Sequence, residues 1–389
     1  MKPVWQQSAE EYIKLASENP DLLSSVDDNP YVNQMERLIE DLLWLPENRV
    51  IALSSATAGI VAILRALGIG KDDEVIVPAF SWGQTLDPVL EIGAIPVFVD
   101  IEPDGVNIDL SRIEEHYGKR TKAIIAAELF GIPLDWMRLH EIAEKTGLYT
   151  IVDSAQSFGA LHWGPMPSAV VFSFGRGKLI CGGEGGAVAV NNVNLYDALL
   201  LSSQHPIRVM QNLQADIPYE LIDSISPNAR IHPFSAVLIH SQIVEYRKNL
   251  CKYHHFIIKI RRQLDDAGLR PVTIPLETSQ SPKVVAILPE EPDDLKEYCY
   301  EFGWEVNSCC QKPLVFSPTI KNLQFLPALK HIGFHQRHIK VRHTSDEYPN
   351  TIRTSRSLYL VNPFTDAPQT YSSQKTDNEL IHSYQNQAC

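Results

Sequence analysis

A lysine that follows an apolar run and lies among glycines is the residue of this sequence best suited to covalent chemistry. Residues 169–172 are apolar, and the next six residues, SFGRGK, end at Lys178. The alternative is that Lys178 is an ordinary surface residue, because most lysines lie on solvated faces. In a pocket of low dielectric constant, however, a lysine loses its proton readily and forms a Schiff base with a carbonyl compound. Lys178 is therefore the candidate nucleophile.

A carboxylate occupies the corresponding position after another apolar run. Asp153 follows residues 149–152 and begins the stretch DSAQ. An aspartate in this place can pair with the protonated pyridine nitrogen of a cofactor. It can equally cap a helix, and the residue alone does not separate the two interpretations.

Two stretches of small residues have the composition of phosphate-binding or turn segments. SSATAG, residues 54–59, lies between an apolar run and a helical pattern, where backbone N–H groups and the helix dipole bind anions. The alternative is plain N-capping by serine or threonine. Taken alone, the stretch favours this alternative. GGEGG, residues 182–186, needs the backbone freedom of glycine, and a tight turn explains it without a ligand.

The elements that carry these stretches alternate in a way that predicts an α/β fold. Seven short apolar runs are expected to be strands buried on both faces, with helices between several of them. The expected strands cover residues 50–53, 74–77, 96–99, 123–127, 149–152, 169–172 and 187–190, and the expected helices 58–67, 85–92 and 135–146. This order favours right-handed crossovers in a mostly parallel sheet between helices. Ligands bind outside the carboxyl ends of such strands, so the residues above are predicted to meet at one edge.

The length of 389 residues favours a large domain and a smaller second one. A helical pattern at about 233–253 marks the expected boundary. Residues 1–250, with an N-terminal segment 1–30, are predicted to form the large α/β domain, and residues 251–389 a smaller α+β domain. The polar tail from about residue 365 is expected to be disordered.

Composition argues against several classes of protein. The net charge of −13 does not suit a nucleic-acid binder, which needs a basic face. No apolar run approaches the roughly 20 residues of a membrane span, and the first residues have no signal-peptide core. A soluble, cytoplasmic protein that binds neither nucleic acid nor membrane is therefore predicted.

Neither a disulfide framework nor a metal site is predicted. The six cysteines are scattered, with no CxxC pair. His331, His335 and His338 share one face of a possible helix, but no fourth metal ligand is indicated. Residues 331–343 are interpreted as a basic surface segment, with a phosphate-binding patch near the substrate as the alternative.

The order and spacing of these stretches resemble the DegT/DnrJ/StrS aminotransferases, a family of pyridoxal 5'-phosphate (PLP) enzymes best known for aminating keto-sugars. The resemblance runs from about residue 32 to residue 242. The matching stretches are SATA (55–58), PAFSW (78–82), GAIPVFVD (93–100), DSAQ (153–156), SF with the lysine five residues beyond the serine (173–178), GEGG (183–186) and PNAR (227–230).

This resemblance implies the aspartate-aminotransferase-like fold, fold type I, and catalysis with PLP. It implies that Lys178 holds PLP as a Schiff base and shuttles the substrate proton, while Asp153 keeps the pyridine nitrogen protonated. Gln156 is implied to bind the ring hydroxyl, and Trp82 to cover one face of the ring. The implied substrates are an amino donor, glutamate or glutamine, and a small-molecule keto acceptor.

The family also implies how the phosphate is held. Its ligands would be Ala56, Thr57 and Ser173, with Asn228 contributed by the partner subunit. The working unit would then be a homodimer with shared active sites. Arg230 is the candidate substrate ligand.

Departures from the family pattern occur in both halves, and the larger ones are on the substrate side. Ala56 replaces a usual glycine, and Arg176-Gly177 is unusual before the lysine. Residues 5–28 differ from the family's glycine-containing N-terminal segment, and LVFSP at 314–318 lacks the histidine of the family's Leu-His-x-x-Pro loop. A specialised acceptor is therefore predicted, in the biosynthesis of an amino-sugar, an aminocyclitol or a related secondary metabolite.

Three alternatives remain open. The first is a PLP-dependent sugar dehydratase, in which a histidine replaces the lysine, so Lys178 argues against it. The second is another fold-type-I reaction, such as decarboxylation or C–C bond chemistry, which uses the same cofactor residues. The third is an inactive PLP-binding regulator, against which both Lys178 and Asp153 argue.

Overall fold

A seven-stranded sheet forms the centre of the computed structural model, which describes residues 3–216, 228–275, 278–282, 284–289, 292–302, 304–309, 314 and 347–363. The strand order is β1-β7-β6-β5-β4-β2-β3. The strands are β1 (Val50–Leu53), β2 (Glu74–Pro78), β3 (Ile95–Val99), β4 (Thr121–Ala127), β5 (Tyr149–Asp153), β6 (Ala169–Ser173) and β7 (Gly186–Val190). All neighbours pair in parallel except β7, which runs antiparallel to both β1 and β6. The predicted mostly parallel α/β sheet is confirmed.

Local sequence signals explain where the helices between these strands begin. The three predicted helices are present as α3 (Ala56–Ala66), α4 (Gly83–Glu91) and α5 (Trp136–Thr146). Ser55 caps α3 by accepting the N–H of Ala58, and Asp135 caps α5 by accepting the N–H of Arg138. Such caps satisfy N–H groups that have no partner inside the helix.

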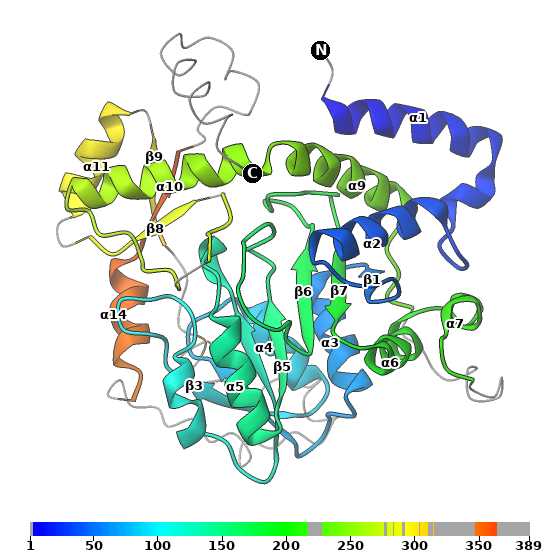
Figure 1. The fold of residues 1–389 in the computed structure, drawn as a ribbon, viewed down its shortest axis with the longest axis horizontal. Coiled ribbons are helices and arrows are strands. Elements are labelled where there is room, and N and C mark those ends of the chain that lie inside the picture. The colour runs from blue at the N-terminus through cyan, green and yellow to red at the C-terminus, as the bar shows by residue number, and fades with distance from the viewer. Residues whose placement is uncertain are drawn as a thin grey trace, which may run out of the picture.

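Helices cover both faces of the sheet, as the apolar strands require. One face packs on α3, α4 and α6 (Val193–Ser203). The other packs on α5, on α2 (Pro30–Leu42) and on α9 (Pro233–Lys248). Two further N-terminal elements, α1 (Val4–Glu18) and the short η1 (Pro20–Leu23), lie against α9 (Figure 1). Alternate strand residues face opposite helical layers, so every strand is buried on both sides.

The prediction of one long helix over residues 233–253 was wrong. The helix α9 ends at Lys248, and α10 (Leu250–Asp266) begins after a break at Asn249, whose φ is −115° and ψ is 10°. The Asn249 side chain donates to the carbonyl oxygen of Glu245 at 3.1 Å. Asparagine competes in this way for backbone groups that would otherwise continue a helix.

A second, smaller sheet lies at the far end of α10. Its antiparallel strand order is β8-β10-β9, with β8 (Val285–Ile287), β9 (Glu305–Ser308) and β10 (Tyr359–Asn362). The helices α10 and α11 (Pro292–Glu301) share its apolar cluster. Next to it, α14 (Pro349–Ser357) joins the large sheet through bonds from the N–H groups of Asn350 and Thr351 to Asp100 (Figure 1). We propose that the two domains divide near Asn249, close to the predicted boundary at residue 250.

Some predictions concern residues outside the described ranges: the tail from residue 365, the basic segment 331–343 and residues 315–318 of the LVFSP stretch. Within the described ranges, no helix is both long and apolar enough to cross a membrane.

A buried ion pair joins three elements of the large domain. Arg208, on α7 (Pro206–Asn212), is 2 % exposed and donates to both carboxylate oxygens of Glu36 on α2, at 2.6 and 2.7 Å. Glu36 also accepts the N–H of Ala52 in β1, at 2.7 Å. The pair therefore fixes α2 and α7 against the edge strand β1.

We predict that Glu36→Gln lowers the free energy of unfolding by about 3–5 kcal/mol, because it leaves the buried Arg208 without a counter-charge. Urea unfolding of the purified variant measures the change. The matched control is Arg65→Gln, which breaks an exposed pair with Glu91 and is expected to cost less than about 1 kcal/mol. Equal losses in the two variants would contradict this account.

Candidate active site

The predicted site residues meet at the carboxyl edge of the large sheet. Asp153 ends β5 and Ser173 ends β6. At the ends of β1 and β2, the chain turns into α3 at Ala56 and into α4 after Trp82. These four strands point the same way, so residues far apart in the sequence arrive at one edge.

Asp153 is a buried carboxylate with one internal donor on each oxygen. Its Oδ2 accepts the Thr85 hydroxyl at 2.8 Å, and its Oδ1 accepts the N–H of Ala155 at 3.2 Å. Burial raises the pKa of Asp153; the two donated bonds and the charge of Lys178 act against that rise, while Glu128 adds to it. Each oxygen keeps a second lone pair for a further donor.

Lys178 lies within the electrostatic reach of Asp153. Burial lowers the pKa of Lys178, and the Asp153 carboxylate opposes that effect. The lysine is held in a turn in which its N–H donates to the carbonyl of Gly175 at 3.2 Å, and Gly177 in this turn has a φ of 81°, in the left-handed region. A partly desolvated amine beside a buried carboxylate is the arrangement expected of a lysine that acts as nucleophile and base.

The phosphate-loop candidate is closely packed against the glycine-rich turn. Ser55 pairs with Gly185 in an isolated bridge, and a Cβ on Gly186 would lie only 2.4 Å from the Ser55 carbonyl carbon. Only glycine permits this close approach. The GGEGG stretch therefore forms the tight turn that was predicted, and this turn also packs β7 against the start of α3. The first N–H groups of α3, at Ala56 and Thr57, precede the one that Ser55 caps.

Residues 228–230 lie beside the same loop of their own chain. The Ala229 carbonyl accepts the N–H of Ser54 at 2.9 Å, and Arg230 bridges Leu53 in antiparallel fashion. Asn228 is exposed and has a φ of 50°. Within the described part of the chain, the buried Nε of Arg230 has no hydrogen-bond partner.

Three further candidates border the edge. Gln156 accepts the N–H of Phe130 with its Oε1 at 3.0 Å, which leaves its amide N–H groups as donors. Trp82 is 46 % exposed, far more than a core tryptophan, and lies at the N-cap of α4. The Ser173 hydroxyl accepts a long 3.5 Å bond from the N–H of Gly175.

A buried acid that was not predicted from the sequence organises the loop after Asp153. Glu128, directly after β4, accepts hydroxyl donors from Ser154 at 2.8 Å and from Ser157, accepts the N–H of Leu134 at 3.0 Å, and lies 2.6 Å from His162 Nε2. Burial alone raises the pKa of Glu128, but His162 and these bonds outweigh it and hold the pKa below its usual value. The signal was available, because Glu128 follows an expected strand just as Asp153 does.

Thr85 and Ser81 were missed as well. Ser81 is fully buried and Thr85 is 1 % exposed, and their hydroxyl oxygens are 2.8 Å apart. Thr85 fell at the start of an expected helix, where threonine is ordinary. Nothing in the pattern indicated that its hydroxyl would meet Asp153.

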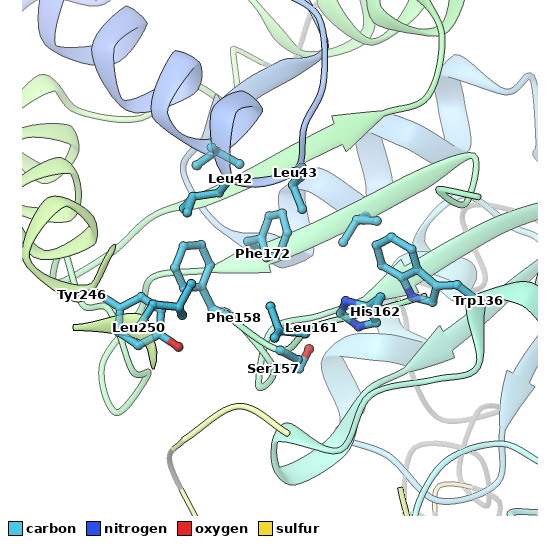
Figure 2. Close-up of a pocket in the computed structure, with 14 residues that line it drawn as sticks. Leu42, Leu43, Trp136, Ser157, Phe158, Leu161, His162, Phe172, Tyr246 and Leu250 are labelled. Carbon is cyan, nitrogen blue, oxygen red and sulfur yellow. The ribbon is translucent and has the colours of Figure 1, made fainter. Parts of the chain in front are cut away.

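An apolar pocket lies apart from the predicted site residues. It is formed by the end of α2, by α9 and α10, and by residues 157–162, and no predicted site residue lines it (Figure 2). Figure 2 shows Leu42, Phe158, Trp136 and Leu250 around it. Such a lining does not suit a phosphate or a carboxylate. Among the described residues, no group of three or more His, Cys, Asp or Glu residues is placed to hold a metal ion.

Comparison with solved structures shows the class of fold. A DegT DnrJ EryC1 StrS aminotransferase from Brucella abortus superimposes with a TM-score of 0.69 and 24% identity, over 93% of this chain and 92% of that one. A synthase of 3-amino-5-hydroxybenzoic acid gives a TM-score of 0.71 at 20% identity, over 92% and 91% of the two chains. A proposed sugar aminotransferase of Streptococcus pneumoniae, in its PMP form, gives 0.72 at 21% identity, over 97% and 94%. The chain has the fold type I architecture of PLP-dependent aminotransferases.

The sequence places the chain within this class. The pattern of the DegT/DnrJ/EryC1/StrS aminotransferase family matches residues 18–323, and the chain belongs to that family. A curated relative, the 3-oxo-glucose-6-phosphate:glutamate aminotransferase of Bacillus subtilis (strain 168), is 33% identical over 233 residues. This match covers 56% of the present chain and about half, 52%, of the relative.

The coupling between Asp153 and Lys178 can be measured without a cofactor. In Asp153→Asn, the carboxylate that raises the pKa of Lys178 is gone, so the pKa of the lysine is expected to fall further. Reductive methylation of the cofactor-free protein, read residue by residue in a mass spectrometer, should then reach half its maximum at a pH lower by roughly one unit. Lys145, which is exposed and pairs with Glu114, is the internal reference. An unchanged Lys178 profile would show that the two groups do not interact.

Proposed function

We propose that this protein is a PLP-dependent aminotransferase that moves an amino group from glutamate or glutamine to the keto group of a sugar, a cyclitol or a related biosynthetic intermediate. The observation that carries the proposal is that a buried aspartate ends β5 and a partly buried lysine follows the neighbouring parallel strand β6, at one edge of the sheet. Family membership supports it, as does a relative whose name specifies glutamate.

The residues present at this edge fit PLP. Asp153 has a lone pair on each oxygen for a ring N–H, and Lys178 is partly desolvated. When bound, the cofactor would supply an electron sink that stabilises negative charge at the reacting carbon. The Lys178 amine would bind its carbonyl carbon, and once released would move a proton at the substrate carbon. The Asp153 carboxylate would accept the ring N–H.

The other residues would orient and hold the cofactor. The N–H groups of Ala56 and Thr57, at the positive end of α3, suit a phosphate, together with the hydroxyls of Thr57 and Ser173. Gln156 would donate to the ring hydroxyl through its amide N–H, since its oxygen already accepts from Phe130.

Two further proposed contacts come from a half-exposed side chain, Trp82, and a partly buried one, Arg230. The half-exposed Trp82 offers a flat face for the ring, because the large exposed area of an aromatic side chain favours stacking. Arg230 is proposed as a substrate ligand, supported by its unpartnered buried Nε.

The function is tested by following the cofactor in each half of the reaction. With PLP added, the purified protein should show a visible absorbance that borohydride removes, and glutamate or glutamine should convert the cofactor to its pyridoxamine form. Lys178→Ala is expected to lose this conversion by several orders of magnitude, because both the covalent anchor and the proton carrier are absent. Full activity in that variant would contradict the proposal.

The second half identifies the acceptor class. A panel of keto-sugars, keto-sugar nucleotides and keto-cyclitols is offered to the pyridoxamine form. Reaction with simple α-keto acids alone would make the protein an amino-acid transaminase. If no amino donor yields the pyridoxamine form, another PLP reaction or a regulatory role replaces transamination.

We also propose a homodimer in which Asn228 contacts the phosphate in the site of the partner subunit. The exposure of Asn228 and its place beside the phosphate loop support a role at an interface. The cytoplasmic location remains a prediction.

Mixed dimers test this sharing. Lys178→Ala and Asn228→Asp should each be inactive, the second because a carboxylate repels the phosphate; aspartate also tolerates the positive φ of residue 228. Mixed and re-associated, they should recover about a quarter of wild-type activity, since half of the dimers contain one intact site of two. No recovery in verified hybrids would refute shared sites.

A further inference from the structure

The Thr85 hydroxyl is turned away from its own helix toward Asp153, 68 residues further along the chain, at 2.8 Å. Thr85 is the third residue of α4, and a threonine in a helix commonly bonds a nearby backbone group of its own helix or faces solvent. Thr85 does neither, since it is 1 % exposed and its proton goes to the carboxylate. This placement indicates a task beyond helix formation.

Counting protons gives the direction of the bonds. A hydroxyl has one proton, and Thr85 donates it to Asp153. In the 2.8 Å contact between Ser81 and Thr85, Ser81 must therefore be the donor. The two hydroxyls form a chain from Ser81 through Thr85 to Oδ2 of Asp153, and successive bonds of this kind polarise one another toward the negative end.

The geometry leaves the carboxylate held but not saturated. Ala155 fixes Oδ1 and Thr85 fixes Oδ2, from two different elements, so rotation of the carboxylate would break at least one bond. The charged groups that act on it are Lys178, beyond β6, and Glu128, beyond β4. Glu128 and burial both favour the neutral acid, so donors are needed to keep Asp153 ionised.

We propose that Thr85, supported by Ser81, is a positioning residue that aims the Asp153 carboxylate at the ring nitrogen of PLP and thereby keeps that nitrogen protonated. The inference rests on the proposed function. Because Trp82 occupies the N-cap position of the helix that carries Thr85, the first turn of α4 would position both the residue that orients Asp153 and the aromatic cover of the ring.

The test uses Thr85→Val, which keeps the shape and removes the hydroxyl, with Thr85→Ser as the conservative rescue and Ser81→Ala to remove the second hydroxyl. In the cofactor-free protein, ¹³C NMR of labelled aspartate reports the titration of Asp153. Its midpoint should rise by about one pH unit or more in Thr85→Val, since a hydrogen bond to the charged form is lost. It should rise less in Ser81→Ala and return toward wild type in Thr85→Ser.

In the holoprotein, ¹⁵N-labelled PLP reports ring protonation directly. The wild-type ring nitrogen should stay protonated to higher pH than that of Thr85→Val, and kcat for the glutamate half-reaction should fall about 10- to 100-fold in that variant. A merely structural threonine would lower stability and leave both NMR midpoints unchanged, which would overturn the inference.

The outcomes separate the two proposals. If the wild-type protein binds PLP and converts it with glutamate, but Thr85→Val matches it in both titrations, the positioning role fails while the proposed function stands. If the wild-type protein takes up no PLP, the proposed function fails and the inference falls with it.

Discussion

The role proposed for Asp153 requires a negative charge on a buried side chain, and this requirement is the constraint on which the carboxyl edge of the sheet depends. Burial of an aspartate favours its neutral form. Three groups oppose this effect and lower the pKa of Asp153: the Thr85 hydroxyl, the N–H of Ala155 and the charge of Lys178. These groups come from α4, from the loop after β5 and from the segment after β6. Burial also lowers the pKa of Lys178. Because Asp153 and Lys178 carry opposite charges, each one reduces the pKa shift that burial causes in the other. A doubly wound sheet supplies this arrangement because its strand ends converge.

Glu128 solves a related problem for the neighbouring loop. It is fully buried, and it is satisfied by two serine hydroxyls, one N–H and His162. Its own N–H donates to the carbonyl of Asp153 at 3.0 Å. The loop that carries Gln156 is thus fastened to β4 on one side and continues from Asp153 on the other. Half-satisfied networks of this kind are costly, so the completeness of this one makes the loop a rigid support.

The fold and the principal pair of the site were accessible from the sequence because they leave local signals. Buried parallel strands read as continuous apolar runs, and Lys178 stood out among glycines. Thr85 left no such signal, because a threonine at the start of a helix looks ordinary until its distant partner is known. The break at Asn249 was missed because periodicity reports an apolar stripe and not a local competition for backbone carbonyls. The buried Glu36–Arg208 pair joins residues far apart in the chain, and one sequence read without structure does not reveal such a contact. The helix α2 was missed although local signals mark its start, where Asn29 is the cap and Pro30 the first residue.

Some side chains at the carboxyl edge of the sheet are fixed by hydrogen bonds and others are not. This difference bears on how the site can become specific for one acceptor. The groups assigned to the pyridine ring are fixed by hydrogen bonds within the described chain: Asp153 to Thr85 and Ala155, and Gln156 to Phe130. Trp82 is half exposed, Asn228 is exposed, and Arg230 has a buried Nε without a partner among the described residues. A preorganised set of contacts suits chemistry that is common to every substrate. Specificity for an acceptor requires polar groups matched to that acceptor. Such residues can be substituted during evolution only where the protein does not need them to stabilise its fold. The larger departures of this sequence from the family pattern, residues 5–28 and the LVFSP stretch, agree with that division.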